Sequence, residues 1–108
     1  MSKVGNTAMM IVTIFCLAGI SAAAPAPRSG KQVYESFCKT CHEIGLSGAP
    51  KYGDRKWREL EKKEGRKRLI KEAIKGEGAM PPRGGCTDCT DGEIKAAVLY
   101  MIDSAKQK

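Results

Sequence analysis

Two cysteines and a histidine stand close together in the pentapeptide Cys38-Lys39-Thr40-Cys41-His42. This spacing is that of a c-type haem attachment site. Two cysteines on one helical turn can each form a thioether with a haem vinyl group, and the next residue then lies under the iron. His42 is the only histidine among the 108 residues, so no other histidine could be this axial ligand. The pentapeptide therefore predicts one covalently bound haem c with His42 on the iron.

A second Cys-x-x-Cys pair, Cys86 and Cys89, leaves other chemistries open. Four thiolates from two such pairs could hold a structural zinc ion. The long gap between the pairs and the exported character of the chain, described below, argue against zinc. A thioredoxin-like role for Cys38 and Cys41 is less favoured still, because no βαβ pattern surrounds them. In an oxidising compartment Cys86 and Cys89 can close a small local disulfide.

A six-coordinate haem iron needs a second axial ligand, and two methionines are candidates. Met101 falls on the apolar face of an expected helix, where we expect it to pack in the core. Met80 lies in Gly-Ala-Met-Pro-Pro, a stiff loop that can aim a thioether at iron. We therefore expect His42 and Met80 to be the two ligands. Such ligation raises the potential and leaves no vacancy for substrate, which favours an electron carrier over an enzyme. If Met80 did not bind, the alternative would be a five-coordinate haem enzyme or gas sensor.

The N-terminus has the features of a secretory signal peptide. A short positively charged stretch precedes an apolar run at 8–20, and small residues stand just before Pro25. The run is shorter than the roughly 20 residues of a spanning helix, which favours cleavage over a retained membrane anchor. We therefore expect a signal peptide at 1–24, one haem domain at 25–108 and a periplasmic location.

The chain without residues 1–24 is basic, with 18 basic and 12 acidic residues and a net charge of +6. A basic surface steers acidic proteins or anionic membranes. We expect redox partners with acidic docking surfaces, and membrane association only if residues 1–24 are retained. The small number of aromatic residues and the absence of a binding motif argue against nucleic acid, and the sequence predicts no oligomeric state. The mixed charge run from Glu59 to Lys71 indicates, by default, a solvated helix face.

Apolar spacing predicts an all-α domain in which about four helices surround the haem. Thr90 and Glu93 have the spacing of a capping box, and Gly76 is placed to end a helix. We expect helices over 30–40, over 66–75 and over 91–105, and a further short helix that begins after an N-cap at Asp54. The segment 25–29 should be a mobile lead-in, and 43–53 and 77–89 should be loops.

The chain from about Gly30 to Met101 resembles a class I cytochrome c. The shared pattern is the haem motif near the start, Met80 in a proline loop and a C-terminal helix. Within this class the stretch 73–89, which reads AIKGEGAMPPRGGCTDC, is similar to cytochrome c5. The resemblance implies a small class I cytochrome c fold and a disulfide between Cys86 and Cys89. The charged, glycine-interrupted segment 59–68 departs from the family pattern.

The resemblance also implies roles for residues around the haem. The carbonyl of Pro50 would accept the Nδ1–H of His42 and so fix the ring. Trp57 would lie near a haem propionate, with an ordinary core tryptophan as the alternative. Redox partners would include proteins such as a membrane-bound reductase or terminal oxidase. Four further residues match the crossing of the first and last helices, namely Gly30, Phe37, Ala97 and Tyr100.

Overall fold

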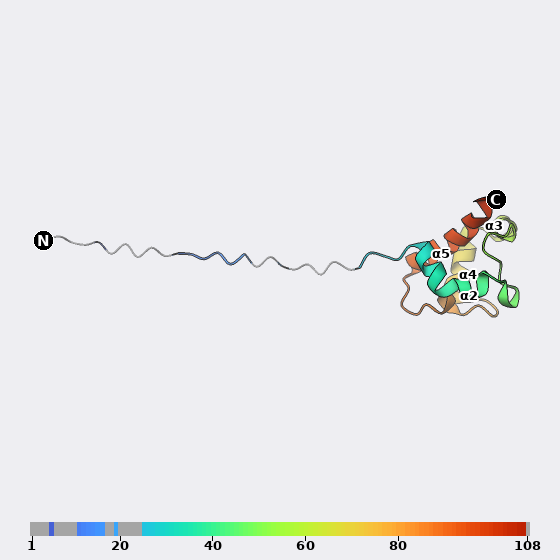
Figure 1. Ribbon diagram of the computed structural model, residues 1–108, viewed down its shortest axis with the longest axis horizontal. Coiled ribbons are helices and arrows are strands. Elements are labelled where there is room, and N and C mark those ends of the chain that lie inside the picture. Colours follow the sequence, from blue (N-terminus) through green and yellow to red (C-terminus); the bar gives the residue numbers. More distant parts are fainter. Residues whose placement is uncertain (1–4, 6–10, 17–18, 20–24, 108) are drawn as a thin grey trace.

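The computed structural model describes residue 5, residues 11–16, residue 19 and residues 25–107 (Figure 1). Most of the expected signal peptide thus lies outside the described residues. The regular structure within residues 25–107 is helical, as expected, and the one strand-like pairing described there is an isolated bridge between Glu77 and Met80. No helix in the described part of the chain is long and apolar enough to cross a membrane.

A single helical run at the start of the domain carries both cysteines of the pentapeptide and its histidine. It begins with a capping box in which Ser29 Oγ accepts the N–H of Gln32 and Gln32 Oε1 accepts the N–H of Ser29. Both backbone donors are satisfied reciprocally, so the helix has a defined start. The run comprises α1 (Gly30–Val33), the π-helical η1 (Tyr34–Cys38) and α2 (Lys39–His42).

The π-helical turn η1 sets which side chains of this run face inward. Its wider turn joins the Lys39 N–H to the Tyr34 carbonyl, five residues back. One such turn separates Val33 from Cys38, and one α turn separates Cys38 from His42. The three side chains therefore lie on one side and are buried. A π turn at this place lets the chain bury a core residue and two site residues with one helix.

The long helix α5 (Asp91–Ser104) crosses the first helical run, as Figure 1 shows for the red and teal ribbons. The Thr90–Glu93 capping box is present at its start. A Cβ atom on Gly30 would stand 2.1 Å from the carbonyl oxygen of Ala96, so only glycine allows the two backbones to come this close. The buried apolar residues of α5 are Ile94, Ala97, Val98, Met101 and Ile102.

Two further helices, α3 (Lys56–Glu64) and α4 (Arg66–Lys75), are separated by Gly65 alone. The bounds of α4 are those expected from its spacing, and Gly76 ends it at φ +85°. The expected N-cap of α3 is shifted, because Arg55 occupies the cap position and makes no side-chain capping bond. Asp54 lies one residue earlier, and its Oδ1 accepts the N–H of Lys56 at 2.9 Å.

The two segments expected as loops contain only short helical turns. These are the 3-10 turns η2 (Leu46–Gly48) and η3 (Pro82–Gly85), and a third, η4 (Ala105–Gln107), follows α5. The core between α1, α4 and α5 also takes in Trp57 from α3. Within the segment 25–29, expected as a mobile lead-in, Arg28 and Ser29 are both bonded to helices.

Candidate functional site

A cavity of about 400 Å³ opens between the first helical run and the irregular segment after α4. Both thiols of the pentapeptide, the imidazole of His42 and the thioether of Met80 belong to its wall. Met80 is distant in sequence from the other three predicted site residues, and the fold brings it to them. The other lining residues are Phe37, Leu46, Ser47, Gly48, Ala49, Pro50, Glu77, Gly78, Ala79, Pro81 and Gly84.

Cys38 is buried and Cys41 is half-buried, and both are free thiols. Burial, with the nearby Cys41, raises the pKa of the Cys38 thiol to about 11. A redox-active Cys-x-x-Cys pair needs the opposite, a thiol with a lowered pKa. A Cβ atom on Gly84 would lie 3.8 Å from Cys38 Sγ, so the facing wall comes close to this sulfur. The pair suits covalent attachment of a group inside the cavity better than thiol exchange.

His42 is held by its own backbone neighbourhood. Its Nδ1 lies 2.8 Å from the carbonyl oxygen of Pro50, as the family resemblance implies. A carbonyl can only accept, so the proton is on Nδ1 and the other ring nitrogen, Nε2, is free to bind metal. The N–H of Tyr52 donates to the His42 carbonyl at 2.7 Å. The first bond orients the imidazole, and the second fixes the backbone that carries it.

Trp57 packs behind the imidazole instead of lining the cavity. Its ring centroid lies 5.7 Å from that of His42, and its side chain is 5 % exposed. The indole N–H donates to the carbonyl of Lys51 at 2.9 Å. In the structure Trp57 therefore supports the wall that holds His42, with its one donor satisfied by the backbone.

Met80 is half-buried in the opposite wall, whereas Met101 is buried in α5 and does not line the cavity. The loop of Met80 is closed by two backbone bonds, from Glu77 N–H to Met80 O at 3.1 Å and from Met80 N–H to Glu77 O at 2.9 Å. A Cβ atom on Gly76 would lie 2.8 Å from Pro82 N and 3.0 Å from Met80 O. Glycine at position 76 thus lets this loop fold back against the end of α4.

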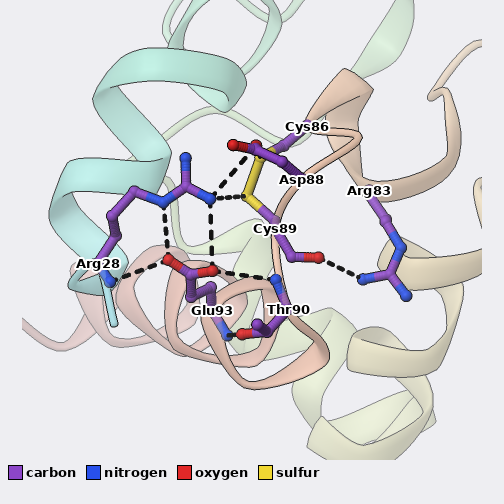
Figure 2. Close-up of a disulfide and its surroundings, with 7 residues drawn as sticks. All are labelled: Arg28, Arg83, Cys86, Asp88, Cys89, Thr90 and Glu93. Carbon is purple, nitrogen blue, oxygen red and sulfur yellow. Dashed lines mark hydrogen bonds and ion pairs between the residues drawn. A yellow bond between two sulfur atoms is a disulfide. The ribbon is translucent and has the colours of Figure 1, made fainter. Parts of the chain in front are cut away.

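Cys86 and Cys89 are joined by a disulfide just after the Met80 loop, with a Cα–Cα distance of 5.4 Å (Figure 2). Arg83, at the centre of η3, donates to the carbonyl of Cys89 at 2.9 Å and ties the loop to the start of α5. Among the described residues the one cluster with metal-ligand spacing is Cys86, Asp88 and Cys89. Its two sulfurs are bonded to each other, so the four-thiolate zinc site does not form.

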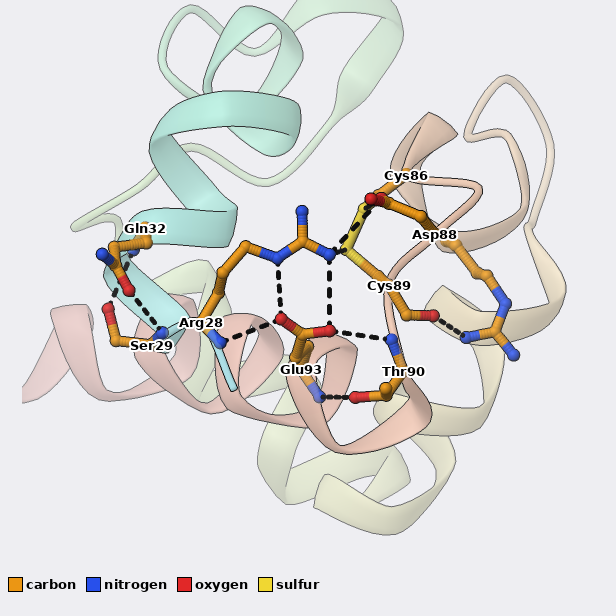
Figure 3. Close-up of polar contacts among 9 residues, drawn as sticks. Arg28, Ser29, Gln32, Cys86, Asp88, Cys89, Thr90 and Glu93 are labelled. Atoms are coloured by element: carbon orange, nitrogen blue, oxygen red, sulfur yellow. Dashed lines mark hydrogen bonds and ion pairs between the residues drawn. A yellow bond between two sulfur atoms is a disulfide. The ribbon is translucent and has the colours of Figure 1, made fainter. Parts of the chain in front are cut away.

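Arg28 is the residue that the sequence analysis missed. Its backbone N–H and its Nε donate to Glu93 Oε2 at 2.9 and 2.7 Å, as Figure 3 shows. Its Nη2 lies 3.3 Å from Asp88 Oδ1 and 3.4 Å from Cys89 Sγ. Its Cζ also stands over the ring of Phe37, 5.8 Å from the centroid. Arg28 therefore links the disulfide and α5 to a residue of the cavity wall.

Glu93 is the acceptor at the centre of this cluster and is 6 % exposed. The hydrogen bond from Arg28, together with the Thr90 N–H, lowers the pKa of its carboxyl to about 2. The sequence signals that Glu93 caps α5, but nothing in it selects Arg28 among the 18 basic residues as the partner.

The donor set of the cavity fits a haem c: two thiols on one wall, an imidazole nitrogen beside them and a thioether opposite. The rest of the lining is mainly apolar side chains and glycines, with Ser47 and Glu77 as the polar exceptions, which suits a large and mostly apolar macrocycle. The structure therefore fits the group that the pentapeptide predicts.

Comparison with known proteins gives the same assignment. The family model described as cytochrome C oxidase, cbb3-type, subunit III matches residues 25–101. Cytochrome c5 of Azotobacter vinelandii is 44% identical over 76 residues, which cover 68% of this chain and 92% of that protein. Cytochrome c-555 of Chlorobaculum tepidum is 38% identical over 82 residues, with coverages of 72% and 76%.

Two solved structures are similar in fold as well as in sequence. A chain in the crystal structure of an electron transfer complex of nitrite reductase with cytochrome c matches with a TM-score of 0.65 and 43% identity, over 70% of this chain and 93% of that one. A mono-heme ferrocytochrome c from Shewanella putrefaciens matches with a TM-score of 0.60 and 40% identity, over 70% and 94%.

Proposed function

The chain belongs to the class I c-type cytochromes, with cytochrome c5 among its relatives, and we propose that it is an exported one-electron carrier whose haem iron is bound by His42 and Met80. Its cofactor is one covalent haem c. Cys38 and Cys41 are the residues proposed to form the two thioethers. The relatives are electron carriers and not enzymes, and this chain is proposed to be the same.

One observation supports the ligand assignment above all, namely that His42, from the first helical run, and Met80, from the loop after α4, line the same cavity. A bound haem would supply one-electron chemistry through the ferric and ferrous states of its iron. Pro50 holds the imidazole with Nε2 directed away from its own hydrogen bond, while the Glu77–Met80 pairing holds the thioether loop. A thioether ligand favours the ferrous state and raises the potential. If His42 and Met80 both bound the iron, they would leave no open position on it for small molecules.

The proposed location is the periplasm, with residues 1–24 removed as a signal peptide. Support comes from the sequence pattern of this segment and from the cysteines, because a disulfide between Cys86 and Cys89 persists in an oxidising compartment. The proposed haem domain at 25–108 contains all helices of the structure.

We propose redox proteins with acidic docking surfaces as partners. A similar chain occurs in an electron transfer complex with nitrite reductase, which supports redox proteins as partners. An exposed apolar side chain, Leu46, lines the cavity where electrons would cross, and Ile44, two residues earlier in the chain, is exposed as well. Contacts of this kind are small and transient, and the electrostatic part of the encounter should weaken as salt rises.

The ligand proposal is tested by Met80→Ala, with Met101→Leu as the matched control. We expect Met80→Ala to abolish the weak near-infrared sulfur-to-iron band of the ferric protein and to lower the reduction potential, because the thioether is lost. Met101→Leu should change neither, since Met101 packs in α5. A high-spin ferric spectrum of the unmodified protein at neutral pH, with rapid cyanide or CO binding, would contradict the proposal and favour a five-coordinate enzyme or sensor.

A further inference from the structure

The positive charge of the domain is concentrated on two helices. Residues 56–75, which form α3 and α4, contain nine basic and four acidic residues and so carry a net charge of +5. The whole of 25–108 carries +6, which leaves only +1 for the other 64 residues. The charge is therefore a property of one region of the molecule and is not spread over its surface.

The exposed layer of this region is even more one-sided. Every exposed residue of α3 and α4 is charged, and Glu59 is the one acidic residue among them. The other carboxylates are half-buried, and two of them, Glu61 and Glu72, pair with Arg66 and Arg68. The exposed basic residues are Lys56, Arg58, Lys62, Lys63, Lys67, Arg68, Lys71 and Lys75, which we call the α3–α4 face.

The lysines of the α3–α4 face are arranged to act together. Lys67, Lys71 and Lys75 follow one another at four-residue spacing, so they form a row along one side of α4. Lys71 and Lys75, with Arg68 and Glu72, also line a shallow hollow on this helix. None of the seven ion pairs found among the described residues involves a lysine of this face. In the described part of the chain, ion pairs therefore do not neutralise the charges of these lysines.

The α3–α4 face is distinct from the surface where electrons would cross. No residue of α3 or α4 lines the cavity. Leu46 does line it and is 48% exposed, and Ile44, two residues earlier in the chain, is 64% exposed. Centres of protein–protein interfaces are depleted of charge and contain apolar side chains. The mouth has that character. The α3–α4 face, which exposes no uncharged side chain, does not.

We propose that the α3–α4 face binds the surface of an anionic lipid bilayer and holds the carrier there, while the cavity mouth remains free for a redox protein. A sheet of lipid headgroups offers dispersed negative charge over an extended area and needs no apolar contact. Such membrane binding goes beyond the proposed electron transfer, because it depends on the exposed charges of the α3–α4 face and not on the haem site. It also revises the expectation that this segment is only a solvated face and that membrane association requires residues 1–24.

The test uses the purified haem-loaded protein and vesicles of equimolar phosphatidylglycerol and phosphatidylcholine. We expect the protein to sediment with these vesicles at low ionic strength, to be released by salt, and not to bind phosphatidylcholine alone. Each lysine near an anionic bilayer is worth about fivefold in affinity, so Lys67→Gln/Lys71→Gln should weaken binding about 25-fold. The control pair Lys31→Gln/Lys95→Gln removes the same charge from exposed positions outside α3 and α4 and should weaken binding less than threefold.

Several results would overturn the proposal. The first two are no binding to the anionic vesicles and equal binding to phosphatidylcholine alone. The third is an equal loss of affinity for the two lysine pairs, which would show that binding depends on the net charge of the protein and not on the α3–α4 face. Slower electron transfer to an acidic protein in the Lys67/Lys71 variant, with vesicle binding unchanged, would make the face a protein-docking surface. The near-infrared band and the potential, measured without lipid, test the electron carrier separately, so either idea can fail alone.

Discussion

The two walls of the haem cavity are built in different ways. The wall of His42 is one helical run whose bonds are local: the imidazole reaches Pro50, eight residues away, and the next contact comes from Tyr52. The wall of Met80 has no helix of its own. Its shape depends on Gly76, on the Cys86–Cys89 disulfide, and on Arg28, which is distant in sequence.

This difference matters for the proposed chemistry. A thioether is a weak iron ligand and needs a loop that is held in place from outside, whereas an imidazole with its Nδ1–H bonded is already oriented. The chain therefore uses a covalent staple and a partly buried ion pair where the backbone is irregular. It uses ordinary helix geometry where the backbone is regular. Substitutions that act on one wall should leave the other largely intact.

The largest effect is expected at the His42 wall, from Gly30→Ala. The new Cβ would stand 2.1 Å from the Ala96 carbonyl oxygen, so α1 and α5 must move apart. We expect a loss of about 3 kcal/mol in the free energy of unfolding, measured by denaturant titration of the haem-loaded protein.

Gly92→Ala is the matched control for Gly30→Ala. Gly92 also lies in the first turn of a helix, but a Cβ there meets nothing nearer than Thr90 Oγ1 at 3.8 Å. Alanine is the better helix former by about 1 kcal/mol, so this variant should be as stable as the original or more so. Equal losses at both glycines would show that the helix crossing is looser than the structure indicates.

The next prediction concerns the Met80 wall and compares Gly76→Ala with Gly65→Ala. The two glycines have nearly the same backbone conformation, φ +85° and ψ 150° against φ +82° and ψ 154°. Both substitutions therefore suffer the same strain. Only at Gly76 does a Cβ also collide with Pro82 and the Met80 carbonyl, whereas at Gly65 it meets open space.

We expect Gly76→Ala to lose about 1 kcal/mol more than Gly65→Ala in thermal unfolding. The near-infrared sulfur-to-iron band should weaken in the Gly76 variant alone, because the collision displaces the Met80 loop. If the two variants lost equal stability and kept equal bands, then the loop would tolerate the shift, and the close packing at position 76 would have no bearing on the thioether.

The same contrast between walls explains how far the sequence could predict the structure. The helix over 66–75, the capping box at Thr90 and the disposition of Cys38 and His42 follow from local rules of spacing and capping, and each was predicted. The bond from Nδ1 of His42 to Pro50 was implied by family resemblance. All of these depend on residues close together in the chain.

The parts that escaped prediction depend on partners distant in sequence or on small backbone shifts. Arg28 lies 65 residues before Glu93, and eighteen basic residues could have filled its place. The π-helical turn at Tyr34–Cys38 has no spacing signal of its own, because the apolar residues at 33, 34, 37 and 38 also fit the stripe of an ordinary α-helix. Segregation of charge onto α3 and α4 was visible in composition, but the half-buried carboxylates beneath it were not.

The smallest expected effect is electrostatic and concerns the ion pair between Arg28 and Glu93, called here the Arg28 clamp, which supports the Met80 wall. Arg28 lowers the pKa of the Glu93 carboxyl to about 2, well below its value of roughly 4.3 in an unfolded chain. Between these values the unfolded state binds more protons than the folded state, so stability falls as pH falls from about 4.5 to 2. Above pH 4.5 the contribution of Glu93 is fully present.

Glu93→Gln removes this contribution and retains the capping box, since glutamine at that position can still accept the Thr90 N–H. We expect the variant to be less stable than the original protein at pH 7, with the difference in unfolding midpoint shrinking as pH falls from 4.5 toward 2. Glu59→Gln, on the exposed side of α3, should show no such convergence. A stability difference for Glu93→Gln that stays constant from pH 7 to pH 2 would mean that the Arg28 clamp is held by packing over Phe37 and the disulfide, and not by the charge of Glu93.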